Sequence, residues 1–271
     1  MNSSTNNRQR PQAIILAAGK GIRMGSDRPK VAIEVAGRPM LWWVVQACRQ
    51  VGVSRCVVVV GYKADQVRAI LEGDSDCVFV DQPQQLGTGH ATRMAEPLFE
   101  AVHADVFVLA GDGPLIRPQT LGRLLEVHRR RGAAATLATS VIDDPTGYGR
   151  IVRGSDGSFQ AIVEQKDASV QQQAIREVYP SYACFRSDVL FSALRQVNNR
   201  NAQGEYYVTD VPALLKGQGH RVEVVDAVPP EDVLGINTLE QFEQVDAILR
   251  RRLEQQSQAA AAAAQPIENA S

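Results

Sequence analysis

The feature that most constrains the fold is a regular alternation of short apolar runs and helical segments between residues 12 and 140. The apolar runs are rich in β-branched residues and have few polar positions, which is typical of strands buried on both faces of a parallel sheet. We expect strands at residues 13–16, 56–60, 77–80, 105–109 and 134–139. Helices are expected at 39–51, 64–72, 88–102 and 118–131. This alternation predicts an α/β fold with a doubly wound, mostly parallel, Rossmann-like sheet.

The pattern changes after about residue 140, where glycine and polar alternation become more frequent. We expect a hairpin over residues 147–152 and 157–163, a further strand at 177–185 and a last strand at 221–225. A helix is expected near 187–197, a polar loop at 198–207 and a charged helix at 238–255. The second half therefore predicts a smaller β subregion appended to the same α/β body.

A length of 271 residues suggests about two domains. Residues 1–11 are polar, and residues 256–271 contain an alanine run with no apolar face to dock, so both ends are expected to be disordered tails. The remaining residues, 12–255, are expected to form one unit with two halves, 12–140 and 141–255.

The composition excludes several classes of protein. Lys and Arg number 29 against 30 Asp and Glu, so the formal charge of −1 gives no basic footprint for a nucleic acid. No apolar stretch reaches the ~18 residues of a membrane span, and the polar opening lacks the apolar region of a secretory signal. The four cysteines form no C-x-x-C pair. We expect a cytoplasmic protein that binds neither nucleic acid nor membrane.

A glycine-rich turn follows the first strand, and three interpretations of it compete. A dinucleotide fingerprint needs glycine where Met24 stands, and a P-loop needs a Gly-Lys-Ser/Thr end that is missing. In the third, small residues bring backbone N–H groups close to phosphate oxygens, while Arg23 and Lys30 add charge. A simple tight turn with two solvated cations stays open as the alternative.

Asp112 is the best candidate for a metal ligand, because it emerges at the carboxyl end of an apolar run. A lone carboxylate there can hold Mg²⁺ while phosphate oxygens and water complete the octahedron. The alternative is an Asp that caps the helix near Pro118 or occupies a turn. His90 is expected to pack at a helix start and not to act as a base.

Seven segments of the chain, in order, resemble one family. The motif L-A-A-G-x-G-x-R-M at 16–24, followed by Pro29-Lys30, is similar to that of the sugar-phosphate nucleotidyltransferases. It looks most like the UDP-N-acetylglucosamine pyrophosphorylase (uridyltransferase) domain of GlmU-type enzymes. The other matching segments are 82–91 (Q-P-Q-Q-L-G-T-G-H-A), 111–115 (G-D-G-P-L), 147–151 (G-Y-G-R-I), 164–168 (E-Q-K-D-A), 201–210 (N-A-Q-G-E-Y-Y-V-T-D) and 235–237 (G-I-N).

The resemblance implies a glycosyltransferase-A-type nucleotidyltransferase fold. It also implies attack by a sugar 1-phosphate on the α-phosphate of UTP, with pyrophosphate released and Mg²⁺ as cofactor. Positioning and electrostatics can carry such a step without a protein nucleophile. Arg23 and Lys30 would be the catalytic cations, and Asn237 would join Asp112 as the second metal ligand.

The resemblance also assigns the two substrates to sets of residues. Gln82 and Gln85 carry both donors and acceptors, as a uracil edge requires. The nucleotide-binding set is expected to be Leu16, Ala17, Ala18, Gly19, Gln82, Gln85, Gly87 and Thr88. The sugar-binding set is expected to be Gly149, Glu164, Tyr179, Tyr206 and Thr209.

The sugar end departs from the family pattern. Tyr179, Pro180 and Ser181 stand where the family has Asn-Thr-Gly, so the sugar pocket is expected to be reshaped. N-acetylglucosamine 1-phosphate with UTP is the first choice. The alternatives are a uridylyl- or thymidylyltransferase for another sugar 1-phosphate and a non-catalytic sugar-nucleotide sensor. Because only one helix and a tail follow residue 240, no acetyltransferase β-helix is expected, and the oligomeric state stays open.

Overall fold

The computed structural model describes residues 10–20, 28–100 and 102–263. Within these residues, ten strands form one sheet in the order β5-β4-β1-β6-β11-β7-β10-β8-β9, with β12 paired to β7. The first half supplies four neighbouring parallel strands. These are β1 (Gln12–Ala17), β4 (Cys56–Val60), β5 (Cys77–Asp81) and β6 (Asp105–Ala110). Four of the five strands predicted before residue 140 are confirmed as parallel neighbours, and their carboxyl ends lie at one edge of the sheet. The fifth predicted strand is present but is separated from them by an antiparallel strand.

Helices cover both faces of this sheet, as the predicted doubly wound fold requires. Alternate residues of each strand point to opposite faces. Helices α1 (Met40–Gln50), α2 (Ala64–Ile70) and α4 (Pro118–Arg131) share one core cluster with Ile15 and Val58. On the other face, Ile14 and Val57 belong to a second cluster with residues of three further helices. Those helices are α3 (Thr88–Arg93), α6 (Ser187–Leu194) and α7 (Val211–Gly217).

The second half mixes strand directions. Strand β11 (Tyr182–Arg186) runs antiparallel between β6 and β7 (Ala135–Val141), and β12 (Val222–Asp226) runs parallel to β7. The predicted hairpin is confirmed as β8 (Gly149–Arg153) and β9 (Phe159–Val163).

The single strand predicted at 177–185 is wrong, because the segment forms two strands. Strand β10 (Glu177–Tyr179) pairs with β7 and β8 and ends before β11 begins. Pro180 has no N–H to donate to a ladder, and Ser181 has a left-handed backbone with φ of +67°. The chain therefore turns at Pro180-Ser181 and enters the sheet at a new place.

Other boundaries also differ from the predictions. The helix expected at 88–102 ends at Arg93, and a 3₁₀ turn at Glu96–Leu98 follows, since Pro97 cannot continue the ladder. Short elements were not predicted at all. These are η2 (Lys30–Ala32), β2 (Glu34–Val35), β3 (Arg38–Pro39), α5 (Val170–Gln173), η4 (Val208–Asp210), α7 and η5 (Pro230–Val233).

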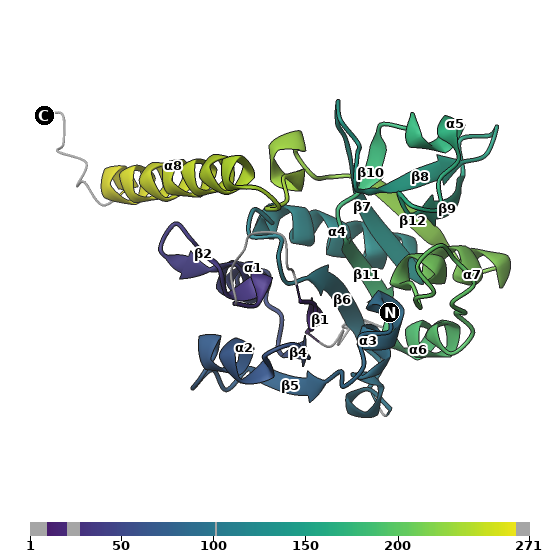
Figure 1. Cartoon of the computed structure of the whole chain (residues 1–271), viewed down its shortest axis with the longest axis horizontal. Coiled ribbons are helices and arrows are strands. Elements are labelled where there is room, and N and C mark those ends of the chain that lie inside the picture. The colour runs from purple at the N-terminus through teal and green to yellow at the C-terminus, as the bar shows by residue number, and fades with distance from the viewer. Residues whose placement is uncertain (1–9, 21–27, 101, 264–271) are drawn as a thin grey trace, which may run out of the picture.

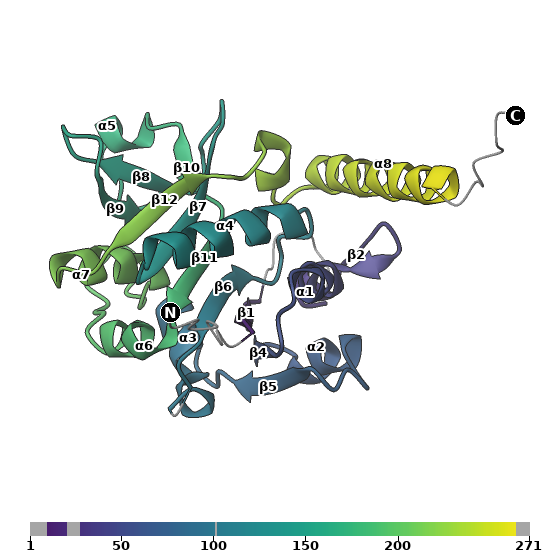
Figure 2. The ribbon, with the colours of Figure 1, turned by 180° about the vertical axis from the view of Figure 1, so that it is seen from behind.

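The last helix, α8 (Leu239–Ala263), is longer than the sequence predicts, because it continues into the alanine run as far as Ala263. Alanine has the highest helix propensity, so the run can stay helical without an apolar face. Figures 1 and 2 show the far end of α8 extending away from the body of the sheet. Its first turns pack on the β2–β3 hairpin in a third apolar cluster. No described helix is long and apolar enough to cross a membrane.

Candidate active site

A cavity of about 620 Å³ lies at the edge where β1, β5 and β6 end. Such carboxyl ends are where open α/β sheets bind ligands. Most of the predicted site residues line it together. They are Leu16, Ala17, Ala18, Gly19, Lys30, Gln82, Gln85, Gly87, Thr88, Asp112, Glu164, Tyr179, Thr209 and Asn237. Gly149 and Tyr206 do not line this cavity, and Arg23 lies outside the described residues.

The end of strand β1 lies tightly against the loop after β6. Gly111 donates its backbone N–H to the Leu16 carbonyl at 2.9 Å, and a Cβ added at Gly111 would lie 2.9 Å from the same oxygen. Only glycine fits this approach without displacing the backbone. The contact fixes the small residues after β1 beside Asp112.

Lys30 and Asp112 form the charged centre of the cavity. The Lys30 Nζ lies 2.6 Å from Asp112 Oδ2, although the two residues are far apart in the sequence. Their side chains are 17% and 36% exposed, so both remain accessible from the cavity. Both predicted side chains are thus present at one point, where they can contact a phosphate or a cation.

Gln82 is held rigidly although it is polar and 3% exposed. Its Nε2 donates to the Gly87 carbonyl at 3.1 Å and lies 2.9 Å from His90 Nδ1. Because an amide nitrogen only donates, we assign the accepting tautomer to His90 Nδ1. Burial lowers the pKa of His90, which favours this neutral form. His90 therefore orients Gln82, which agrees with a packing role and not with a base.

Two of the matching segments, 82–91 and 201–210, are hydrogen-bonded directly to each other. Gly89 donates to the Tyr206 carbonyl at 2.7 Å, and Tyr206 donates to the Leu86 carbonyl at 2.8 Å. Thr88 Oγ1 accepts from the Val208 backbone at 3.0 Å. Gly87 has φ of +108°, and a Cβ there would lie 2.6 Å from the Tyr206 carbonyl oxygen. Tyr206 thus supports the wall of the cavity through its backbone.

In the part of the lining that the second half of the chain supplies, Glu164 and Thr209 form a polar pair. Thr209 Oγ1 donates to Glu164 Oε1 at 2.8 Å. Burial is the largest influence on Glu164 and raises its pKa, while the bond from Thr209 acts in the opposite direction. A Cβ at Gly149 would lie 2.8 Å from Ile162 Cγ2 and 3.7 Å from Glu164 Oε2. Gly149 therefore leaves room for Ile162 and does not line the cavity.

Tyr179 also lines this wall and is 5% exposed. Burial raises the pKa of its hydroxyl, and the nearby Glu164 carboxylate raises it further, so the hydroxyl stays neutral. The next cavity residue, Ser181, was not predicted as part of the site. The available sequence signal was that Ser181 stands where the family motif has glycine, and its φ is positive in the structure.

Tyr148 is a second residue that the sequence analysis did not assign. Its hydroxyl donates to the Val233 carbonyl at 2.7 Å and accepts from the Gly235 backbone at 3.3 Å. These bonds tie the loop that carries Asn237 to the start of β8. Tyr148 belongs to a matching motif, so the motif itself was the signal for its role.

Asp112 and Asn237 supply the donors that Mg²⁺ prefers. Within the residues that the structure describes, no group of three or more His, Cys, Asp or Glu side chains could hold a metal ion. One carboxylate and one amide oxygen facing the same cavity fit a Mg²⁺ ion that keeps water and takes substrate phosphate oxygens. The donor set therefore fits a divalent cation whose remaining ligands are water and substrate phosphate oxygens.

Comparison with known proteins adds the family. The model of the MobA-like NTP transferase domain matches residues 13–210. The bifunctional protein GlmU of Geobacter metallireducens is 44% identical over 241 residues, which are 89% of this chain and 51% of that protein. The GlmU proteins of Heliobacterium modesticaldum and Streptococcus sanguinis are 46% and 43% identical over 89% and 90% of this chain. These alignments cover 52% and 53% of those proteins. The chain thus spans about half the length of the curated relatives.

A solved structure gives the same fold at low sequence identity. A crystal structure of UDP-glucose pyrophosphorylase complexed with UDP-glucose superposes with a TM-score of 0.71 and 16% identity. The match covers 90% of this chain and 100% of that one. The predicted nucleotidyltransferase-type α/β fold is confirmed.

Proposed function

Because this chain belongs to the MobA-like NTP transferase family, we propose that it transfers a uridylyl group from UTP to N-acetylglucosamine 1-phosphate. The products would be UDP-N-acetylglucosamine and pyrophosphate. The observation that carries the proposal is that one cavity is lined by all of these groups. They are the residues after β1, the Lys30–Asp112 pair, Gln82 and the Glu164–Thr209 pair. The identity of 43–46% to GlmU proteins over most of the chain supports the choice of substrates.

The nucleotide occupies the side of the cavity formed by the first half of the chain. Backbone groups at Ala17, Ala18 and Gly19 face the phosphates, and the amides of the buried Gln82 and the exposed Gln85 read the uracil edge. Gln82 is pre-positioned by His90 and Gly87, so little side-chain entropy is lost on binding.

The chemical step needs positioning and charge. Mg²⁺ held by Asp112 and Asn237 would neutralise phosphate oxygens in the in-line transition state. Lys30 lies 2.6 Å from Asp112, so it can release that carboxylate to the cation and place its own charge on the incoming sugar phosphate. Arg23, which lies outside the described residues, is proposed to stabilise the pyrophosphate leaving group.

The sugar occupies the wall built by the second half. Glu164 and Thr209 offer an acceptor and a hydroxyl to the sugar ring, and Tyr179 sets the size of the pocket. Since Tyr179 is large, it is also the observation that favours a second candidate, the same transfer to another sugar 1-phosphate. We further propose a cytoplasmic location for this activity.

A pyrophosphate-release assay tests the function. The protein is incubated with UTP or dTTP, Mg²⁺ and each of several sugar 1-phosphates, and we expect the fastest release with UTP and N-acetylglucosamine 1-phosphate. Omission of Mg²⁺, or addition of EDTA, should abolish release. Faster turnover with another sugar would favour the second candidate. Absence of turnover with all sugars, together with binding of UDP-N-acetylglucosamine, would identify a sensor instead.

A further inference from the structure

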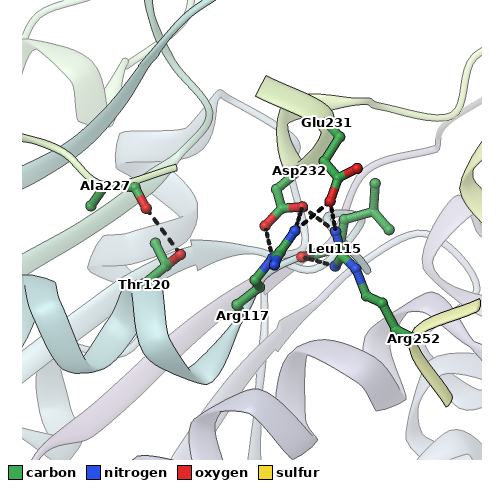
Figure 3. Close-up of polar contacts among 7 residues, drawn as sticks. All are labelled: Leu115, Arg117, Thr120, Ala227, Glu231, Asp232 and Arg252. Carbon is green, nitrogen blue, oxygen red and sulfur yellow. Dashed lines mark hydrogen bonds and ion pairs between the residues drawn. The ribbon is translucent and has the colours of Figure 1, made fainter. Parts of the chain in front are cut away.

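A buried carboxylate lies beside the cavity, between two arginines from distant parts of the chain. Asp232 is in η5, and 1% of its side chain is exposed. Arg117 donates to both carboxylate oxygens, from Nε at 2.5 Å and from Nη2 at 3.0 Å. Arg252 of α8 donates to the same carboxylate through Nη2. Figure 3 shows the two guanidinium groups converging on Asp232.

Further hydrogen bonds link three segments of the chain around Asp232. Glu231 accepts from Arg252 Nη2 at 3.1 Å and also from Arg117 Nη2. Arg252 Nη1 donates to the Leu115 carbonyl at 3.0 Å. We call Arg117, Glu231, Asp232 and Arg252 the arginine clamp. None of these four described residues lines the cavity, so any effect on the reaction acts through other residues.

The clamp connects the two loops that carry the cation ligands. Arg117 follows Asp112 by five residues, and Asp232 precedes Asn237 by five. Leu115 and Ile236 lie, along the chain, between a clamp residue and a cation ligand. Both are fully buried in one apolar cluster. Val245 and Leu249 of α8 belong to the same cluster, and Ile236 also lines the cavity. Helix α8 therefore packs against both loops, at Leu115 and at Ile236.

We propose that the arginine clamp is a positioning device for the cation site. Docking of α8 through Arg252 fixes the spacing of the Asp112 and Asn237 loops and thereby sets the affinity for the divalent cation. The inference rests on the proposed function for its choice of these two ligands. Because coupling between sites is reciprocal, a cation at Asp112 and Asn237 must in turn stabilise the docked form of α8.

The first test measures cation binding without turnover. Arg252→Met keeps an unbranched stem and removes the guanidinium, and Asp232→Asn keeps the shape and removes the charge. Mn²⁺ is titrated into each folded variant and followed by electron paramagnetic resonance. Since residues that orient metal ligands typically contribute 10- to 100-fold to affinity, we expect about tenfold weaker binding. Arg251→Met is the matched control, because Arg251 is the exposed neighbour on the same helix, and it should bind as the wild type does.

The second test uses the wild type, so it remains decisive if both variants fail to fold. Hydrogen exchange is measured by mass spectrometry with and without Mn²⁺. We expect Mn²⁺ to slow exchange at residues 111–117, 233–238 and the clamp-bearing part of α8, and Arg252→Met to remove the protection of α8. Unchanged Mn²⁺ affinity in the folded variants, or unchanged exchange in wild-type α8 at saturating Mn²⁺, would overturn the proposal. Neither readout needs UTP, so a protein that passes both tests but makes no UDP-sugar refutes only the proposed function.

Discussion

The two halves of the sheet build their sides of the cavity in different ways. In the first half, parallel strands end at one edge, and backbone contacts such as Gly111 N–H to Leu16 position the loops. In the second half, side chains line the cavity, chiefly Glu164 after β9, Tyr179 of β10 and Thr209 of η4. Under the proposed function, the first half therefore binds the nucleotide and the second half binds the sugar. Changes in the first half should impair turnover of all sugars equally, whereas changes in the second should alter the choice of sugar.

The largest effect is expected for Asp112→Ala. Loss of the carboxylate beside Lys30 removes the proposed cation ligand, and we expect kcat to fall about 10³-fold, as for loss of a key electrostatic group. The factor should be the same for N-acetylglucosamine 1-phosphate and glucose 1-phosphate, measured by pyrophosphate release. A variant that folds as the wild type and keeps more than about a tenth of its kcat would remove Asp112 from the cation site.

Gly87→Ala tests the junction between the halves. The new Cβ would meet the Tyr206 carbonyl at 2.6 Å in a backbone with φ of +108°. We expect the free energy of unfolding to fall by about 1–3 kcal/mol, measured by urea denaturation, with lower turnover for all sugars. Gly122→Ala is the control, because Gly122 lies inside α4 with open space around its Cα, and a gain of about 0.5–1 kcal/mol is expected there. Equal stability of the Gly87 variant and the wild type would contradict the close contact.

Glu164→Gln tests the sugar side. Loss of a charged acceptor should raise KM for the sugar 1-phosphate roughly 10- to 100-fold and leave KM for UTP unchanged. A parallel rise in both KM values in steady-state kinetics would show that the halves do not divide the substrates.

The same residue predicts a pH dependence of stability. The folded protein holds the pKa of Glu164 above its ordinary value, mainly through burial. Between the two pKa values the folded state binds more protons than the unfolded state, so stability falls as pH rises through this window. Glu164→Gln removes the titrating group and with it this fall in stability. The free energy of unfolding of the variant, compared with that of the wild type, should therefore increase from acidic to neutral pH. Denaturant titrations at several pH values measure the difference, and a difference that is constant with pH would contradict the assignment.

The smallest effect is expected for Tyr179→Phe, which removes one hydroxyl from the cavity wall. The ratio of kcat/KM between two sugar 1-phosphates should change by roughly 2- to 10-fold, as for one neutral hydrogen bond. KM for UTP should stay the same. An unchanged ratio across the sugars would show that the Tyr179 hydroxyl does not contact the sugar.

The sequence predicts the first half better than the second, for physical reasons. Continuous apolar runs such as 56–60 can only be buried strands here, and parallel strands place their following loops at one edge. The break at Pro180-Ser181 is different, because β11 finds its place between β6 and β7 through long-range pairing that local pattern does not encode. The arginine clamp was missed for the same reason, since Arg117, Asp232 and Arg252 meet only in three dimensions.

A competition between two acceptors tests the central claim most directly. The protein is supplied with UTP, Mg²⁺ and equal amounts of N-acetylglucosamine 1-phosphate and glucose 1-phosphate, and nucleotide sugars are identified by mass spectrometry. We expect UDP-N-acetylglucosamine as the main product, formed together with an equal amount of pyrophosphate. Absence of any UDP-sugar would contradict uridylyl transfer, and an excess of UDP-glucose would contradict the proposed sugar.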